Sequence, residues 1–337
     1  KDRLIMMFGA STVTFPYANT YLTIYTLGSF FALMAIGLNF FITCQGFAMI
    51  GMLTVIIGAL VNILLDTVFI FGLEMGVAGA AWATVIAQIT SFAFAFRFLT
   101  SKKIKIPITF KGYSFEIIQD IIKFGFSPFF ILTTDSIILI ALNAMLQKYG
   151  GTTQGDLLVS GATIIQSYLL LITGPLIGLS GGTQPLLSFN YGARQIERVK
   201  KAEKYIVIFA LVLTTTMFIL TPFISPYFIS LFTDEVNLAE VARWGIKASV
   251  WGIISLSFQY CFVDGFTAVG RIKTAFSLSM FRKMIYMGST FFLPAIFEAR
   301  SAFYAQPVSD ILGAIASTTV FYFIFNKHLE RRKKVLQ

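Results

Sequence analysis

Long apolar stretches follow one another along the whole chain, with only short polar breaks between them. Each stretch is long enough to cross the hydrocarbon core of a membrane, which is about 30 Å thick and takes about 20 helical residues. The stretches lack the period-two alternation of outer-membrane strands, so they predict helices rather than a barrel. The sequence therefore predicts an all-α polytopic membrane protein with about nine transmembrane helices, at residues 20–43, 52–73, 77–99, 121–147, 157–187, 203–231, 245–267, 275–297 and 302–325.

The charged residues support the same class. They make up 12% of the 337 residues, whereas soluble proteins average about 25%. The net charge is +10, but Lys and Arg lie mainly in the short breaks, as in the cytoplasmic loops of membrane proteins. We therefore expect the lipid bilayer as a partner and no nucleic acid. The one histidine, His328, lies in a basic tail, where we expect it to be solvated.

The distribution of Lys and Arg also predicts an orientation. Most of the 26 basic residues fall on one side if the C-terminus is cytoplasmic, which is the arrangement that the positive-inside rule favours. We therefore expect a multi-pass protein of the cell (inner or plasma) membrane with a cytoplasmic C-terminus. Nine helices then place residue 1 outside, which an upstream part of the protein would explain.

The longest polar break divides the chain into two lobes, with three predicted helices before it and six after it. Within this break, residues 115–122 have the apolar spacing of an amphipathic helix on the membrane surface. The predicted organisation is the C-terminal half of the N-lobe at 1–100, a cytoplasmic linker at 101–120, the C-lobe at 121–326 and a basic cytoplasmic tail at 327–337.

A weak internal similarity suggests that the two lobes are related by a pseudo-twofold repeat. Aligning Phe8 with Phe232 also aligns Gly28 with Gly252, and such repeats are common in transporters. If the repeat is real, the first lobe should also have six helices, of which this chain holds three.

Asp66 is the most informative single residue, because it lies in the middle of an apolar stretch. A carboxylate at a helix centre costs about 2.5–3.5 kcal/mol on insertion scales, so it should face the interior of a bundle. Asn62 lies four residues earlier on the same helical face, and Thr84 on the next helix could offer a hydroxyl. A buried carboxyl suits proton binding, and the amide oxygen would equally suit Na⁺. The alternative is a buried Asp that only bonds a neighbouring helix.

The second predicted lobe holds further acids within its helices. Asp135 is flanked by hydroxyl side chains and either faces a cavity or is a capped buried acid, whereas Asp264 is either a cavity residue or solvated at the interface. Glycines and prolines at Gly174-Pro175 and within 181–185 interrupt the fifth stretch, as is typical of transporter helices that bend.

Three blocks of this sequence resemble the multidrug and toxic compound extrusion (MATE) family, and most closely its bacterial multidrug members. The first is Asn62-x3-Asp66 with the text from Glu74 to Thr84. The second runs from Gly182 to Ala193 and is followed by a basic helix start. The third joins Phe281-Arg282-Lys283-Met284 to Gln306-Pro307-Val308-Ser309-Asp310.

The resemblance implies a twelve-helix, two-lobed, V-shaped antiporter that expels amphiphilic organic cations in exchange for H⁺ or Na⁺. Asn62, Asp66 and Thr84 match three residues of the family's first-lobe cation site, with Na⁺ as a candidate ligand of Asp66 and Asn62. The site's further Asp has no counterpart, because the chain begins just before the family's fourth helix and so lacks the first three. We expect a monomer with no cofactor and no enzymatic activity.

A second-lobe site of some family members needs two acids. Asp135 could supply the first, but Gln259 stands at the position of the second, with Asp264 a little over a turn later. These three residues are therefore candidates for a C-lobe cavity.

Three other functions compete with drug export. A flippase for lipid-linked precursors would need cationic side chains inside its cavity, but only Arg282 and Lys283 lie outside the loops, near a helix end from which they could snorkel. An intramembrane hydrolase is suggested by the G-x-S-x-G pattern around Ser180, which has no histidine partner within the membrane. A channel would need a filter motif, and none occurs.

Overall fold

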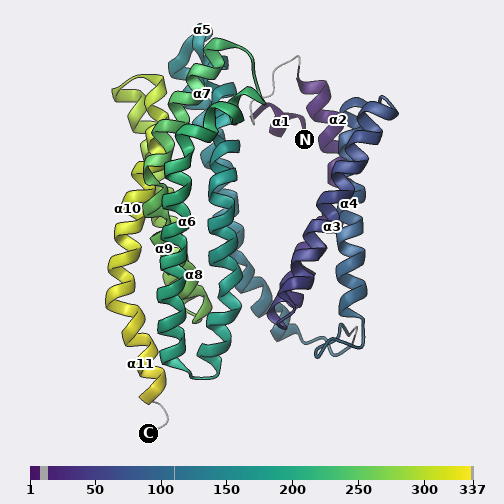
Figure 1. The fold of residues 1–337 in the computed structure, drawn as a ribbon, viewed down its shortest axis with the longest axis vertical. Helices are drawn as coiled ribbons and strands as arrows, with labels where there is room; N and C mark the ends of the chain where they lie inside the picture. Colours follow the sequence, from purple (N-terminus) through teal and green to yellow (C-terminus); the bar gives the residue numbers. More distant parts are fainter. Residues whose placement is uncertain (8–13, 110, 335–337) are drawn as a thin grey trace. The chain divides into compact units, whose positions relative to one another are not determined.

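The computed structural model describes residues 1–7, 14–109 and 111–334, whose regular secondary structure is helical, with no β-strand among them. The all-α polytopic prediction is confirmed. The helices, labelled in Figure 1, are α1 (Asp2–Met7), α2 (Phe15–Cys44), α3 (Ala48–Asp66), α4 (Gly76–Leu99), α5 (Phe115–Gly192), α6 (Ile196–Ser230), α7 (Val236–Ser249), α8 (Ile253–Ala268), α9 (Ile272–Ile296), α10 (Ala305–Val320) and α11 (Asn326–Lys334).

Eight helical stretches of the described chain are long and apolar enough to cross a membrane. Three of them are composite: α3 continues into a π-helix, Thr67–Gly72, α7 continues into α8 through a 3-10 turn, and a second 3-10 turn, Ala299–Tyr304, leads into α10 and α11. The remaining predicted span, 275–297, corresponds to α9, which has 25 residues but carries Arg282 and Lys283 near its middle. These two charges lower its hydropathy, although its length suffices to cross the hydrocarbon core.

The helix α5 departs from the sequence prediction in two places. Residues 115–122 form no separate surface helix, because they are the first turns of one helix that runs from Phe115 to Gly151. The chain then bends at Gly151, whose φ of 65° is a left-handed conformation that glycine adopts readily, and continues as Gln154–Gly192. The prolines Pro175 and Pro185 do not interrupt this second part, in keeping with the tolerance of proline inside membrane helices.

The chain divides into two compact units, Lys1–Gln119 and Asp120–Gln337. In the first unit, α4 packs against both α2 and α3. Small residues permit this close approach: a Cβ on Gly58 of α3 would clash with Ser91 of α4, whose hydroxyl donates a hydrogen bond to the Thr54 carbonyl over 3.1 Å. Close packing of small residues is the usual basis of helix association in lipid.

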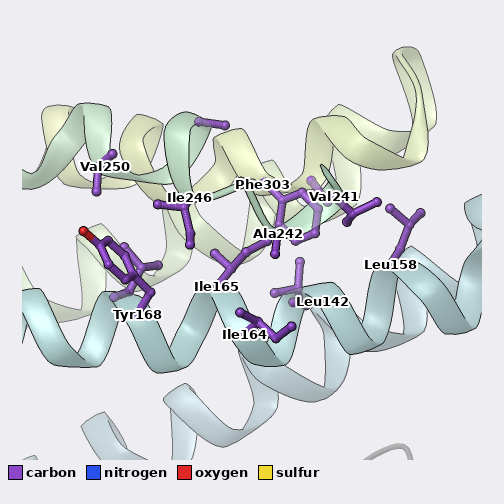
Figure 2. Close-up of a cluster of buried hydrophobic side chains, with 14 of the residues drawn as sticks. Leu142, Leu158, Ile164, Ile165, Tyr168, Val241, Ala242, Ile246, Val250 and Phe303 are labelled. Carbon is purple, nitrogen blue, oxygen red and sulfur yellow. The ribbon is translucent and has the colours of Figure 1, made fainter. Parts of the chain in front are cut away.

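The second unit has two apolar cores. One joins the second part of α5 to α7 and the Ala299–Tyr304 turn, and Figure 2 shows Ile165 of α5 close to Ala242 and Phe303. The other joins α6, α8 and the end of the α10 stretch. There a π-helical segment, Phe321–Phe325, stacks Phe321 on Phe262 with ring centroids 4.0 Å apart. The two cores lie toward opposite ends of the α5–α8 helices and hold them together along their length.

His328 is not solvated, contrary to the expectation from its basic tail. Its ring stacks on Tyr191, its Nε2 lies 2.8 Å from the Tyr191 hydroxyl, and its Nδ1 accepts a hydrogen bond from Nε of Arg271 over 3.0 Å. Because Nδ1 accepts a proton donor here, the ring is neutral in this arrangement. The tail of α11 is thereby attached to the turns that end α5 and α8.

Candidate functional site

In the first unit, the structure brings Asn62 of α3 and Thr84 of α4 together. The Asn62 amide nitrogen lies 3.5 Å from Oγ1 of Thr84, at the long end of the hydrogen-bonding range. The Thr84 hydroxyl in turn donates to the Ala80 carbonyl over 2.9 Å, so its lone pairs face the amide donor. This arrangement uses the amide nitrogen of Asn62 and leaves the amide oxygen available as a ligand.

Asp66 lies one turn beyond Asn62, at the last residue of α3. The backbone then continues as a π-helix, Thr67–Gly72, and such segments occur often at functional sites. Oδ1 of Asp66 is buried and has no hydrogen-bond partner among the described residues. A buried polar atom without a partner costs about 1–3 kcal/mol, so this oxygen is a ready acceptor for a proton or a cation.

The three polar side chains define what this site can bind. They offer one carboxylate, one amide oxygen and one hydroxyl, which are the oxygen ligands of hard cations. Among the described residues no group of three or more His, Cys, Asp or Glu side chains could hold a metal ion.

The three predicted residues of the second unit have separate partners. Asp135, on the first part of α5, forms an ion pair with Lys283 of α9; the carboxylate side chain is 56% exposed and the lysine 4%. Gln259 of α8 donates to the Leu278 carbonyl over 3.3 Å. Asp264 of α8 accepts a hydrogen bond from Ser180 over 2.5 Å. The described contacts do not join them into one cluster.

The main charge pairs of the second unit were not predicted from the sequence. Arg282 does not snorkel to a helix end: its Nη1 lies 2.9 Å from Oδ1 of Asp310 on α10, with the two side chains 14% and 2% exposed. Gln306 also donates to Asp310 over 3.1 Å. Together with Lys283 and Asp135, the pairs place two cations and two acids inside a membrane helix bundle. Charges in that setting are expensive unless paired, so the presence of both cations and acids within apolar stretches of the sequence was a signal of such pairs.

The apolar helices, the paired charges and the Asp66 oxygen without a partner among the described residues define the class of protein. It is a polytopic membrane protein with charged groups among its helices, as in transporters. The MatE family model matches residues 132–292. The multidrug export protein MepA of Staphylococcus aureus (strain MSSA476) is 23% identical over 325 residues, which are 96% of this chain and 71% of that protein. MepA of Staphylococcus saprophyticus is 20% identical over 338 residues, 100% and 74% of the two chains.

Solved structures agree with the sequence comparison. The structure described as MATE in the bent conformation matches 99% of this chain and 73% of its own with a TM-score of 0.81 at 21% identity. An outward-facing multidrug resistance MATE family transporter matches 97% and 72% with a TM-score of 0.83 at 22% identity. The resemblance to the MATE family of transporters that the sequence predicts is confirmed.

The relatives of this chain are named as export proteins and not as enzymes. At the G-x-S-x-G pattern, Ser180 donates a hydrogen bond to Asp264, whereas the one histidine of the sequence, His328, bonds Tyr191 and Arg271. Ser180 is therefore not bonded to a histidine, the usual base that activates a serine nucleophile.

Proposed function

We propose that this chain is a cation-coupled antiporter of the cell membrane that exports amphiphilic organic cations in exchange for H⁺ or Na⁺. The observation that carries the proposal is the unpartnered Oδ1 of Asp66, buried between apolar helices and one turn from the bonded pair of Asn62 and Thr84. The names of the MepA relatives add the substrate class, since these proteins are described as multidrug exporters.

The coupling ion binds at Asp66 in this proposal. An ionised carboxylate in an apolar bundle is unfavourable, so a proton or Na⁺ that neutralises it stabilises one arrangement of the first lobe over another. A ligand shifts a conformational equilibrium only through its different affinity for the two states. An exported cation and the coupling ion that favour opposite states are thereby exchanged across the membrane.

Orientation and lobe organisation are part of the proposal. The basic residues favour a cytoplasmic C-terminus, residues 101–120 connect two lobes, and residues 1–100 contribute the cation site of the first. The partners are the exported compound, the coupling ion and the bilayer.

The buried cations on α9 are the one feature that favours the alternative of a flippase for anionic, lipid-linked precursors. Arg282 and Lys283 are each paired with an acid, Asp310 and Asp135. The pairs carry no net positive charge, so an anionic headgroup gains little from this part of the lobe. This neutrality supports export of cations over lipid transfer.

The test is efflux of a fluorescent organic cation from proteoliposomes that contain the purified transporter, under an imposed pH gradient or an imposed Na⁺ gradient. We expect one gradient to drive efflux and D66N to abolish it. The matched control is D120N, which changes an exposed carboxylate paired with Lys123 on the surface and should leave efflux unchanged. Undiminished gradient-driven efflux by D66N would refute coupling at this residue and direct attention to Asp135.

A further inference from the structure

Among the described residues, Glu203 is a second buried acid whose carboxyl oxygens have no hydrogen-bond partner. Glu203 lies two turns into α6, and its side chain is 3% exposed. Both of its carboxyl oxygens are buried without a hydrogen-bond partner among the described residues. The surrounding side chains are apolar, and Val199 and Phe266 beside it are completely buried. A carboxyl group in such surroundings needs a partner to be stable in its charged form.

The Glu203 carboxyl lies against α8, where the absence of a side chain makes room for it. A Cβ placed on Gly265 would come within 2.8 Å of Oε1 of Glu203 and within 3.1 Å of Cδ. The residue that precedes Gly265 on α8 is Asp264, which interacts electrostatically with Glu203. Asp264 itself accepts hydrogen bonds from Ser180 and Gln184 of α5. Two carboxyl groups therefore share one apolar space between α5, α6 and α8.

None of the ion pairs among the described residues includes Glu203 or Asp264, whereas Asp135 and Asp310 each pair with a cation of α9. The titratable groups that interact with Glu203 are Asp264 and Cys261, both on α8. From α5 the groups that face this space are the neutral side chains of Ser180 and Gln184.

Two neighbouring carboxylates without a cation cannot both be charged in an apolar space, so the pair must hold at least one proton. Asp264 already accepts hydrogen bonds from Ser180 and Gln184, whereas both oxygens of Glu203 have no partner among the described residues, so Glu203 gains more from a proton. The arrangement suits a proton, since two acids, one hydroxyl and one amide offer fewer ligands than a cage around a divalent metal ion needs.

The site lies toward the end of the second unit that carries the C-terminal tail. Glu203 is near the start of α6 and Asp264 near the end of α8, and the adjoining turns are those to which His328 attaches α11. In the orientation proposed above, this end faces the cytoplasm.

We propose that Glu203 and Asp264 form an exchangeable proton-binding site of the second lobe, with Glu203 carrying the proton and the cytoplasm as the side of exchange. The role of this proton in transport rests on the proposed function, because it would be exchanged during the export cycle. The binding of the proton itself does not, and it can be measured without transport.

The direct test is infrared spectroscopy of the purified transporter, in which a protonated carboxyl gives its own carbonyl stretching band. We expect such a band at neutral pH, its loss in E203Q, and its retention in E197Q. Glu197 is a matched control because it lies on the same helix with a side chain that is 78% exposed. The band should also persist in D66N, which separates this site from the one at Asp66.

Asp264 provides a second variant should E203Q fail to insert into membranes. D264N removes the neighbouring charge, so the Glu203 band should titrate over a different pH range, whereas E197Q should leave that range unchanged. A spectrum of E203Q identical to that of the unmodified protein at every pH would overturn the proposal. So would loss of the band on addition of NaCl at constant pH, because the pair would then bind Na⁺ instead.

The two proposals can fail separately. If no gradient drives efflux but the Glu203 band is present, the antiport proposal falls and the proton site stands. If gradient-driven efflux depends on Asp66 but E203Q changes neither the infrared band nor the dependence of efflux on cytoplasmic pH, the proton site falls and antiport stands.

Discussion

Replacing Asp310 with asparagine should destabilise the second unit strongly, because it leaves Arg282 charged inside a membrane helix bundle. In the structure Nη1 of Arg282 lies 2.9 Å from Oδ1 of Asp310, and the Asp310 side chain is 2% exposed. The Tyr260 ring, 5.9 Å from the guanidinium carbon, also favours the cation. It cannot replace a carboxylate, since a cation–π contact is worth only about 0.5–2 kcal/mol.

The expected magnitude follows from this geometry. Breaking a buried pair by removal of one partner costs about 3–5 kcal/mol. The amide introduced by D310N keeps one hydrogen-bond acceptor for Arg282, so we expect the lower end, about 3 kcal/mol. A change of 1 kcal/mol shifts the unfolding temperature of a domain of 150–250 residues by about 2–4 °C, which predicts a decrease of about 6–12 °C.

The assay is thermal unfolding of the purified protein in detergent, followed by the loss of the monodisperse peak in size-exclusion chromatography. The control is D120N, which breaks a surface pair whose side chains are 70% and 62% exposed; exposed pairs contribute about 0–1 kcal/mol. The double variant R282M/D310L removes both charges and should recover most of the stability lost in D310N. An unfolding temperature of D310N equal to that of D120N, or a double variant no more stable than D310N, would refute the reasoning.

Two further predictions concern packing and orientation. G313A should lower the unfolding free energy by about 1–3 kcal/mol through overpacking, because a Cβ there would lie 2.9 Å from Cγ of Arg282. The control is G288A, whose Cβ meets nothing within 4 Å. Equal unfolding temperatures of the two variants would contradict the packing argument. In a cysteine-free background, K327C should react with a membrane-impermeant thiol reagent only from the cytoplasmic side and E298C only from outside. Both positions are exposed, and they lie at opposite ends of one helical stretch. Labelling with the reverse sidedness would overturn the proposed orientation.

The charge pairs of α9 connect this helix to two neighbouring helices of the second unit. Arg282 bonds α10, and Lys283 bonds the first part of α5, so adjacent residues of one helix are attached to two different neighbours. Asp135 is the exposed member of its pair, at 56%. A cationic compound that reached Asp135 would compete with Lys283 for the same carboxylate, which connects substrate binding to the position of α9.

The class of protein and most of its helices could be predicted from the sequence alone. Hydropathy over about 20 residues depends only on the local chain, so the apolar stretches identified the helices of both units. The proximity of Asn62 to Asp66 follows from helical spacing on α3, and the family motif supplied Thr84 as the third member. The stretch 275–297 was likewise predicted as a helix, although two charges lie in its middle, and the structure shows both charges to be paired.

Only the tertiary structure decided which charged side chains meet. Arg282 and Asp310 are 28 residues apart, and Lys283 and Asp135 are 148 apart, so their pairing depends on which helices pack together, which no local pattern records. Glu203 is a further example. Its neighbours in the sequence are lysines at the start of α6, so it resembles a loop residue. The packing of α6 on Gly265 nevertheless buries it. Local spacing determines which face of a helix a residue occupies, and tertiary packing determines whether that face meets lipid, water or another charge.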